Sequence, residues 1–284
     1  MTDKPHASFA LPGHGLVTLE GRDALAFAQA QFMSDVASLG DGAWHWSGWL
    51  TPKGRVIALF ALLRRDADTV WLVLPDADRE SFATALRRYV FRSKVVIGVP
   101  DVPIAGQLGC GSGGSRELAV AASAAPTTES MIALDMSGDG GPRTLLIGEA
   151  APADADALAR WTAADLAHGL PRLPPSQAEK WTPQQLSLER LRAFSVKKGC
   201  YPGQEIVART HFLGQAKRGL VLLESDALID VGAEVIGDGQ AIGTVVSAMD
   251  GLALAVLPLA READGMTAGG AAVRERPLLG GLSR

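Results

Sequence analysis

The sequence predicts an α+β protein in which a mixed region, residues 1–213, precedes a small β-barrel or β-sandwich, residues 214–284. Three observations support this prediction. Short β-branched runs alternate with helical patterns up to about residue 168, as in mixed folds. After Lys217 the helical periodicity disappears, and glycine-rich turns separate short apolar runs. The length of 284 residues suits two or three modules better than one small domain.

The first part of the mixed region predicts a strand at 16–20, a helix within 21–33 and a β-hairpin over 44–63. Asp23 is a suitable residue to begin the helix, because a carboxylate accepts hydrogen bonds from free backbone N–H groups. The hairpin turn is Thr51-Pro52-Lys53-Gly54. Three tryptophans of the hairpin either fill the core or form an aromatic wall for a flat ligand; they are Trp44, Trp46 and Trp49.

The next segment predicts a βαβ unit with a strand at 69–74, a helix from Asp76 to about Phe91, and a strand at 95–99. Four apolar side chains share one face of this helix: Phe82, Leu86, Tyr89 and Val90. Four cations lie on its other face and beyond its end: Arg87, Arg88, Arg92 and Lys94. Cations near a helix C-terminus complement the helix dipole, which accounts for part of this cluster.

Residues 105–130 are rich in glycine, serine and alanine, and Gly111 to Gly114 within them predict a flexible turn. No Lys-Ser/Thr pair follows the glycines at the spacing of a phosphate-binding loop, and we interpret Cys110 beside them as an incidental thiol. A strand at 143–147 and a helix at 154–168 follow, and Gly169 with the nearby prolines ends that helix. The strands expected in the second region are 220–223, 241–247 and 252–257.

Composition and charge exclude several classes of protein. The net charge is −4, so nucleic-acid binding would need a local basic patch. The two cysteines are far apart and fit a reducing compartment, and they are too few for a disulfide framework or for the four ligands of an iron–sulfur cluster. The first residues lack an apolar signal core and no run is long enough to span a membrane, so we expect a cytoplasmic protein.

One stretch, residues 197–205, combines residue types that ordinary packing does not require: two lysines, two glycines, a proline and a cysteine. The Pro-Gly pair at 202–203 predicts the start of a helix in which Glu205 and Arg209 pair four residues apart. Cys200 then lies just before a helix N-terminus and beside two lysines, which favours the reactive thiolate. The alternative is a small buried cysteine in a tight turn.

Two glycines of this stretch, Gly199 and Gly203, would let another group approach the backbone closely. His211 is the nearest candidate base in the sequence, so a Cys–His hydrolase would need a partner brought to Cys200 by the fold. The spacings typical of metal ligands are absent, and no metal site is predicted.

The segment 188–220 carries seven cations and two acids, so its local charge is 7 − 2 = +5. The cations are Arg190, Arg192, Lys197, Lys198, Arg209, Lys217 and Arg218. Together with the cations around residue 90 they would form an electropositive face for an anionic ligand, namely a glutamate tail, a phosphate or an RNA backbone. The alternative is scattered, solvated charge.

Residues Lys198-Gly199-Cys200-Tyr201-Pro202-Gly203-Gln204-Glu205 resemble the K-G-C-Y-x-G-Q-E signature of the YgfZ family. The resemblance extends to five further segments: 19–23 with 29–36, 50–55, 88–94, 183–184, and 207–209 through 217–218. The stretch from about residue 100 to about residue 150 has no recognisable match to the family. Ser187 stands where the family pattern has Asn.

The resemblance implies the fold of the glycine-cleavage T-protein: an aminomethyltransferase-like fold with a ferredoxin-like α/β module and a C-terminal β-barrel. It implies a tetrahydrofolate-binding accessory protein that supports iron–sulfur enzymes and tRNA modification. The flat pterin and anionic tail of a folate agree with an aromatic residue such as Trp181 and with the basic excess. The candidate residues for the chemistry are Cys200, Lys198, Tyr201, Gln204 and Glu205, and those for folate are Trp181, Gln184, Gly199, Gly203 and Arg209.

Two other functions remain open. A folate-dependent aminomethyl or one-carbon transferase shares the implied fold, but its family places an acid in the strand at 55–60, which has none here, and another before Gly169, where Ala167 stands. That family also lacks the signature cysteine. A direct RNA-binding module would use the basic face and bind tRNA with an affinity that falls with salt.

Overall fold

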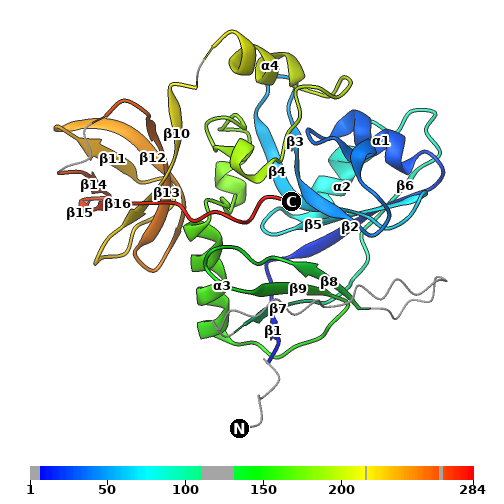
Figure 1. Cartoon of the computed structure of the whole chain (residues 1–284), viewed down its shortest axis with the longest axis horizontal. Helices are drawn as coiled ribbons and strands as arrows, with labels where there is room; N and C mark the ends of the chain where they lie inside the picture. Colours follow the sequence, from blue (N-terminus) through cyan, green and yellow to red (C-terminus); the bar gives the residue numbers. More distant parts are fainter. Residues whose placement is uncertain (1–6, 110–130, 215, 262–264) are drawn as a thin grey trace.

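The computed structural model describes residues 7–109, 131–214, 216–261 and 265–284. Cys110 and the predicted turn from Gly111 to Gly114 lie outside these ranges, so both interpretations stay predictions. The described chain forms three β-sheets with helices packed against them, which confirms the predicted α+β class. Figure 1 shows the seven-stranded sheet to one side of the other two. None of the described helices is long and apolar enough to cross a membrane.

A five-stranded antiparallel sheet has the order β3-β4-β5-β2-β6. Its strands are β2 (Gly15–Glu20), β3 (Trp44–Leu50), β4 (Val56–Arg64), β5 (Thr69–Leu74) and β6 (Val96–Gly98). Helices α1 (Ala24–Gln31) and α2 (Arg79–Arg87) connect strands that are not neighbours, as in a ferredoxin-like module. One face of the sheet, with Phe60 and Leu72, forms a core with Phe27 and Phe82 of the helices.

Helix α2 begins later and ends earlier than predicted. Its N-cap is Asp78, whose side chain accepts a hydrogen bond from the Ser81 amide at 2.8 Å. The Asp76 carboxylate is instead paired with Arg172 at 2.7 Å, so it is not free to cap the helix. The prediction that Tyr89 shares the buried face is also wrong, because the helix ends before this residue and its side chain is exposed.

A four-stranded antiparallel sheet has the order β1-β7-β9-β8. Its strands are β1 (Phe9–Ala10), β7 (Ile104–Leu108), β9 (Arg143–Ile147) and β8 (Ile132–Asp135). Helix α3 (Ala155–Ala167) packs on it, where Trp161 meets Phe9 edge to face with ring centroids 6.0 Å apart. The sequence does not predict β7 or β8, because short runs of small residues carry little periodicity.

Short elements follow α1 and α3. They are the 3-10 helices η1 (Val36–Ser38), η2 (Pro175–Gln177) and η3 (Leu188–Leu191), and the helix α4 (Gln204–Phe212). The seven-stranded sheet comes next, with the order β15-β14-β11-β12-β13-β10-β16. Its strands are β10 (Arg218–Glu224), β11 (Glu234–Gly237), β12 (Gln240–Met249), β13 (Leu252–Pro258), β14 (Thr267–Ala268), β15 (Ala271–Ala272) and β16 (Arg274–Arg276). This sheet has a core of its own, which includes Leu223, Val245 and Leu257.

After β16 the chain turns back to the mixed region, which the sequence does not predict (Figure 1, red). Leu282 is buried there, and its carbonyl oxygen accepts a hydrogen bond from Trp46 Nε1 at 3.0 Å. Leu278 packs against the same core. The last residues of the predicted second region therefore take part in the core of the first.

Candidate functional site

The turn that carries the signature is fixed first by Lys198. Its side chain is buried, and its ammonium group donates hydrogen bonds to the carbonyl oxygens of Gln29, Phe32 and Ser34, the last at 2.9 Å. These carbonyls lie at and just beyond the C-terminal end of α1, where a helix leaves acceptors free and favours positive charge. Lys198 thus ties the signature turn to α1.

This placement corrects the prediction that Lys198 contributes to an electropositive face for an anionic ligand, and equally the alternative that it is a scattered, solvated charge. The other residues of that predicted face include Lys197, Arg209 and Lys217, which are exposed. Burial lowers the pKa of the Lys198 ammonium group to about 8, while the charge of Asp35 acts in the opposite direction. The adjacent residues Lys197 and Lys198 therefore differ, because Lys197 is an exposed surface cation whereas Lys198 is buried and anchors the signature turn.

Tyr201 is the second fixed point of the turn. Its hydroxyl group donates a hydrogen bond to the Ser195 carbonyl oxygen at 3.0 Å, and the Lys198 ammonium lies 4.9 Å from the centroid of its ring. Burial raises the pKa of Tyr201 to about 12, so the hydroxyl group stays protonated at neutral pH. Gln204 adds a third contact, since its side-chain amide donates to the Lys198 carbonyl oxygen at 3.1 Å.

Gly203 sits directly against the β3–β4 turn. Its φ angle is +79°, and a Cβ atom at this position would lie 2.7 Å from both Gly54 Cα and the Thr51 carbonyl oxygen. Gly54 has a φ angle of +69°, and a Cβ atom there would lie 2.9 Å from the Cβ of Ile206 in α4. The predicted close approach at Gly203 is therefore made by the chain's own hairpin turn.

Gly199 does not have the close neighbour that the sequence suggested. A Cβ atom built on it would meet nothing within 4 Å, because the residue is exposed at the outer side of the turn. Cys200 beside it is exposed as well, so the alternative of a small buried cysteine is wrong. The signature turn therefore presents its thiol outward while Lys198, Tyr201 and Gly203 anchor it inward.

Helix α4 follows the turn as predicted, with Gly203 as its N-cap. Glu205 and Arg209 form the expected ion pair at 2.7 Å on its surface, where their side chains are 80% and 63% exposed. Such an exposed pair contributes little to stability. Both side chains remain open to solvent beside the cysteine turn.

Trp181 and Gln184, predicted to contact folate, both have partners within the chain. The indole Nε1 of Trp181 donates to the Gln177 side-chain oxygen at 3.0 Å, and the residue is half-buried. The Gln184 amide donates to the Val207 carbonyl oxygen in α4 at 2.8 Å, and its own side-chain oxygen is buried without a hydrogen-bond partner. Gln184 thus links its segment to α4.

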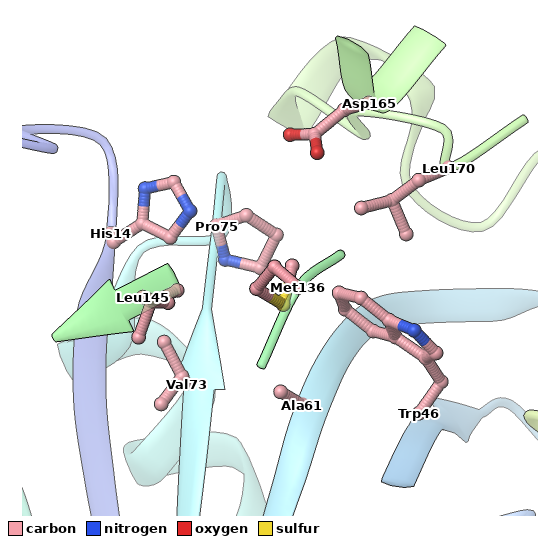
Figure 2. Close-up of a pocket in the computed structure, with 9 residues that line it drawn as sticks. All are labelled: His14, Trp46, Ala61, Val73, Pro75, Met136, Leu145, Asp165 and Leu170. Atoms are coloured by element: carbon pink, nitrogen blue, oxygen red, sulfur yellow. The ribbon is translucent and has the colours of Figure 1, made fainter. Parts of the chain in front are cut away.

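A small cavity lies where the two sheets of the mixed region meet the end of α3 (Figure 2). Its volume is about 10 Å³, which is room for about one water molecule. Its lining is His14, Trp46, Ala61, Val73, Pro75, Met136, Leu145, Asp165 and Leu170. Trp46 therefore both fills the core and lines the cavity, whereas Trp49 packs against Phe82 and Tyr89.

The polar wall of the cavity is part of a buried ion network. The Asp165 carboxylate pairs with Arg143 at 2.7 Å and with Arg172 at 3.4 Å, and Arg172 continues to Asp76. His14 faces the cavity with an Nδ1 atom that has no hydrogen-bond partner. Burial, and then the charge of Arg172, hold the pKa of His14 well below its usual value, so the imidazole is neutral at physiological pH.

A larger groove adjoins this wall and shares His14 with the cavity. Its volume is about 570 Å³, and four acidic residues and Arg79 line it. The acids are Asp76, Asp78, Asp101 and Glu149. Sequence reasoning missed both hollows, because His14 lies in a loop without periodicity and Asp165 is one acid among the alanines of α3. The sequence did carry one signal for Asp165, because this acidic residue falls on the apolar face of the helix predicted at 154–168.

Among the described residues, no three or more His, Cys, Asp or Glu side chains gather as a metal site would require.

A family model described as CAF17, C-terminal beta-barrel domain, matches residues 217–277. A protein of Aliivibrio fischeri strain MJ11, named tRNA-modifying protein YgfZ, is 30% identical over an alignment of 265 residues, and the match covers 86% of this chain and 82% of that protein. An uncharacterized protein of Haemophilus influenzae is 29% identical over an alignment of 252 residues, and the match covers 85% of this chain and 84% of that protein.

The architecture also resembles a solved structure. The glycine cleavage system aminomethyltransferase T from Bartonella henselae superposes with a TM-score of 0.68 at 18% identity, over 95% of this chain and 84% of that chain. This similarity confirms the predicted aminomethyltransferase-like fold, and at this identity it bears on the fold alone.

Proposed function

The chain belongs to the YgfZ family, and on that premise we propose that it is a tetrahydrofolate-binding accessory protein for tRNA modification and iron–sulfur enzymes, with Cys200 as its key thiol. The observation that carries this proposal is the geometry of the signature turn. An exposed cysteine on a turn held by a buried lysine, a buried tyrosine and a glycine contact is positioned to meet an external partner.

The arrangement of acids supports an accessory role over aminomethyl transfer. Strand β4, where the transferase family has an acid, is apolar up to Arg64. Asp165 is the one carboxylate among the residues that line the cavity, and two arginines bind it. Both of its oxygen atoms are therefore already paired within the chain, Oδ1 with Arg143 and Oδ2 with Arg172.

The cavity has some of the chemistry that a pterin would need but not the room. The N–H groups of a pterin suit the Asp165 carboxylate and the unpartnered Nδ1 of His14, and its flat ring suits the face of the Trp46 indole. The volume of about 10 Å³ accommodates a water molecule and not a bicyclic ring. The cavity as described therefore does not fit folate, whereas the adjoining groove of about 570 Å³ lies in the range of ligand sites.

The folate contacts predicted from the sequence are retained in this proposal as candidates: Trp181, Gln184, Gly199, Gly203 and Arg209. Two features support them, namely the unpartnered side-chain oxygen of Gln184 and the exposed cation of Arg209. Gly203 would act through its contact with Gly54, which fixes the turn, and Gly199 through its exposed backbone.

Titration with tetrahydrofolate, followed by tryptophan fluorescence and by calorimetry, tests the binding half of this proposal. We expect saturable binding to the native protein and to Cys200→Ala, because the thiol is assigned to a partner. Trp181→Ala should bind more weakly than native, whereas Trp71→Ala, a half-buried tryptophan on β5, serves as the matched control. Absence of saturable binding to the native protein would remove tetrahydrofolate from the proposal.

A further inference from the structure

The segment that joins helix α2 to strand β6 carries exposed aromatic and basic side chains together. Phe91 is 76% exposed and Tyr89 is 45% exposed. Three exposed cations stand beside them in the sequence: Arg88, Arg92 and Lys94. These five residues are called here the aromatic–basic surface. Strand β6 is an edge strand of the five-stranded sheet, and Figure 1 shows it on the side of the molecule away from the seven-stranded sheet.

The positive charge of this surface is not neutralised by neighbouring acids in the sequence. Residues 81–99 contain four cations and no acid. In the part of the chain that the structure describes, no ion pair includes Arg88, Arg92 or Lys94. The helix dipole accounts for cations at the end of α2, but Arg92 and Lys94 lie beyond its last turn. A local group of cations in a chain of net charge −4 attracts an anionic partner to this place.

The support beneath these side chains is fixed by two contacts with other segments. The Lys94 amide donates a hydrogen bond to the Asp23 carboxylate at 2.6 Å, and the Asp23 amide donates to the Lys94 carbonyl oxygen at 3.3 Å. The ring of Tyr89 meets that of Trp49 edge to face, with centroids 5.6 Å apart. Because the segment is already ordered, binding to it costs less conformational entropy than binding to a flexible loop.

Phe91 and Arg92 form the most exposed part of the surface. Arg92 has a φ angle of +62°, which is uncommon for a residue other than glycine. The carbon of its guanidinium group lies 5.1 Å from the centroid of the Phe91 ring. Since Phe91 is largely exposed, its ring remains open to a second flat group. A ring with a cation beside it is the arrangement on which proteins stack the bases of single-stranded nucleic acids.

The combination of rings and cations favours unpaired RNA over other anionic partners. Each nucleotide of an unpaired strand offers one flat base and one charged phosphate, which match a ring and a cation side by side. An acidic protein segment matches the cations alone. In duplex RNA the bases are stacked within the helix and do not reach the rings. A second copy of this chain would bring the same cations against one another, which is unfavourable.

We propose that the aromatic–basic surface binds unpaired RNA, with Phe91 and Tyr89 stacked on bases and the three cations on phosphates. The inference rests on the proposed role in tRNA modification only for the choice of tRNA as the RNA. It adds a direct contact with the RNA, on a segment that carries none of the candidate folate residues and does not include Cys200.

Fluorescence anisotropy with a labelled single-stranded RNA, an unmodified tRNA and a duplex RNA tests the stacking. We expect the native protein to bind the first two more tightly than the duplex. Phe91→Ala should weaken binding of single-stranded RNA by at least about fivefold, because one stacked base is lost. Phe91→Trp should retain the affinity, since the larger ring still stacks. Phe212→Ala, at a phenylalanine of α4 that is 66% exposed, is the matched control and should bind like native protein.

The salt dependence of the same binding tests the phosphate contacts. With three contacts, the logarithm of the association constant should fall with the logarithm of the salt concentration with a slope of about −2. Arg88→Ala should reduce the size of this slope by about 0.7, whereas Phe91→Ala should leave it unchanged. Arg274→Ala, at an exposed arginine on β16, is the control and should leave the slope at its native value.

Three results would overturn the proposal: no RNA binding at low salt, equal affinity for duplex and single strand, or a native affinity in Phe91→Ala. Displacement of the RNA by polyglutamate at equal charge concentration would also overturn it, because the surface would then be a general site for acidic chains. The proposed function is judged separately, by tRNA thiolation in cells. If thiolation is restored by a protein that binds no RNA, the inference alone is wrong. If Phe91-dependent RNA binding is found without thiolation, the proposed function alone is wrong.

Discussion

Gly203 of the signature turn and Gly54 of the β3–β4 turn lie backbone against backbone, so close that a Cβ atom on Gly203 would be 2.7 Å from Gly54 Cα. Both residues have positive φ angles, +79° and +69°. This contact joins two segments that are far apart in the sequence, and it sets the position of the turn that carries Cys200. The signature is therefore one half of a structural unit whose other half is the hairpin turn.

Substitution of Gly203 by alanine should destabilise the protein by about 2–4 kcal/mol, because a strained φ angle and an unavoidable backbone clash add together. Gly199→Ala provides the matched control four residues earlier, since its Cβ would enter open space. Its effect should stay within about 0.5 kcal/mol. Urea unfolding of both variants measures the difference, and equal stability of the two would contradict the interlocked glycines.

The buried ammonium of Lys198 predicts a pH dependence of stability. Its pKa falls from the ordinary 10.5 to about 8 on folding, so between these values the unfolded chain binds more protons than the folded one. Stability relative to a Lys198→Met variant should therefore rise with pH from about 8 to about 10.5, with the full burial penalty present below 8.

Urea unfolding of native protein and Lys198→Met across this pH range measures that slope. Lys197→Met is the control at the neighbouring exposed lysine, and it should unfold like native protein. A flat stability difference between native protein and Lys198→Met would show that the ammonium group is not buried as described.

Two acid–arginine contacts, one buried and one exposed, should respond very differently to neutralisation. Asp165→Asn leaves Arg143 buried without its anionic partner, at a cost of about 3–5 kcal/mol. Glu205→Gln breaks the exposed pair with Arg209 and should cost under about 1 kcal/mol. Thermal and urea unfolding test this contrast, and a loss of similar size in both variants would argue against the buried network.

Local patterns predicted much of the fold. The central strands, the start of α3 at Asp154 and the start of α4 after Gly203 follow from periodicity and capping, which act over a few residues. Asp23 shows the limit of that reasoning. It precedes α1 as predicted, but its carboxylate accepts a hydrogen bond from the Lys94 amide instead of capping the helix.

The candidate site stays a prediction in its residues, and its geometry could not be read from the sequence. Residue types singled out the signature turn, yet nothing local distinguishes Lys197 in solvent from Lys198 in the interior. That difference depends on carbonyl groups at the end of α1, more than 160 residues away. The cavity and the hydrogen bond between Trp46 and Leu282 likewise arise from contacts between distant segments, which periodicity and spacing do not report.

Replacement of the Cys200 thiol tests the central claim most directly. In cells that lack their own YgfZ-family protein, the native chain should restore iron–sulfur-dependent tRNA thiolation. Cys200→Ala should fail to do so while keeping native thermal stability and tetrahydrofolate binding, and Arg274→Ala should restore thiolation fully. Full restoration by Cys200→Ala would contradict the assignment of this thiol as the functional group.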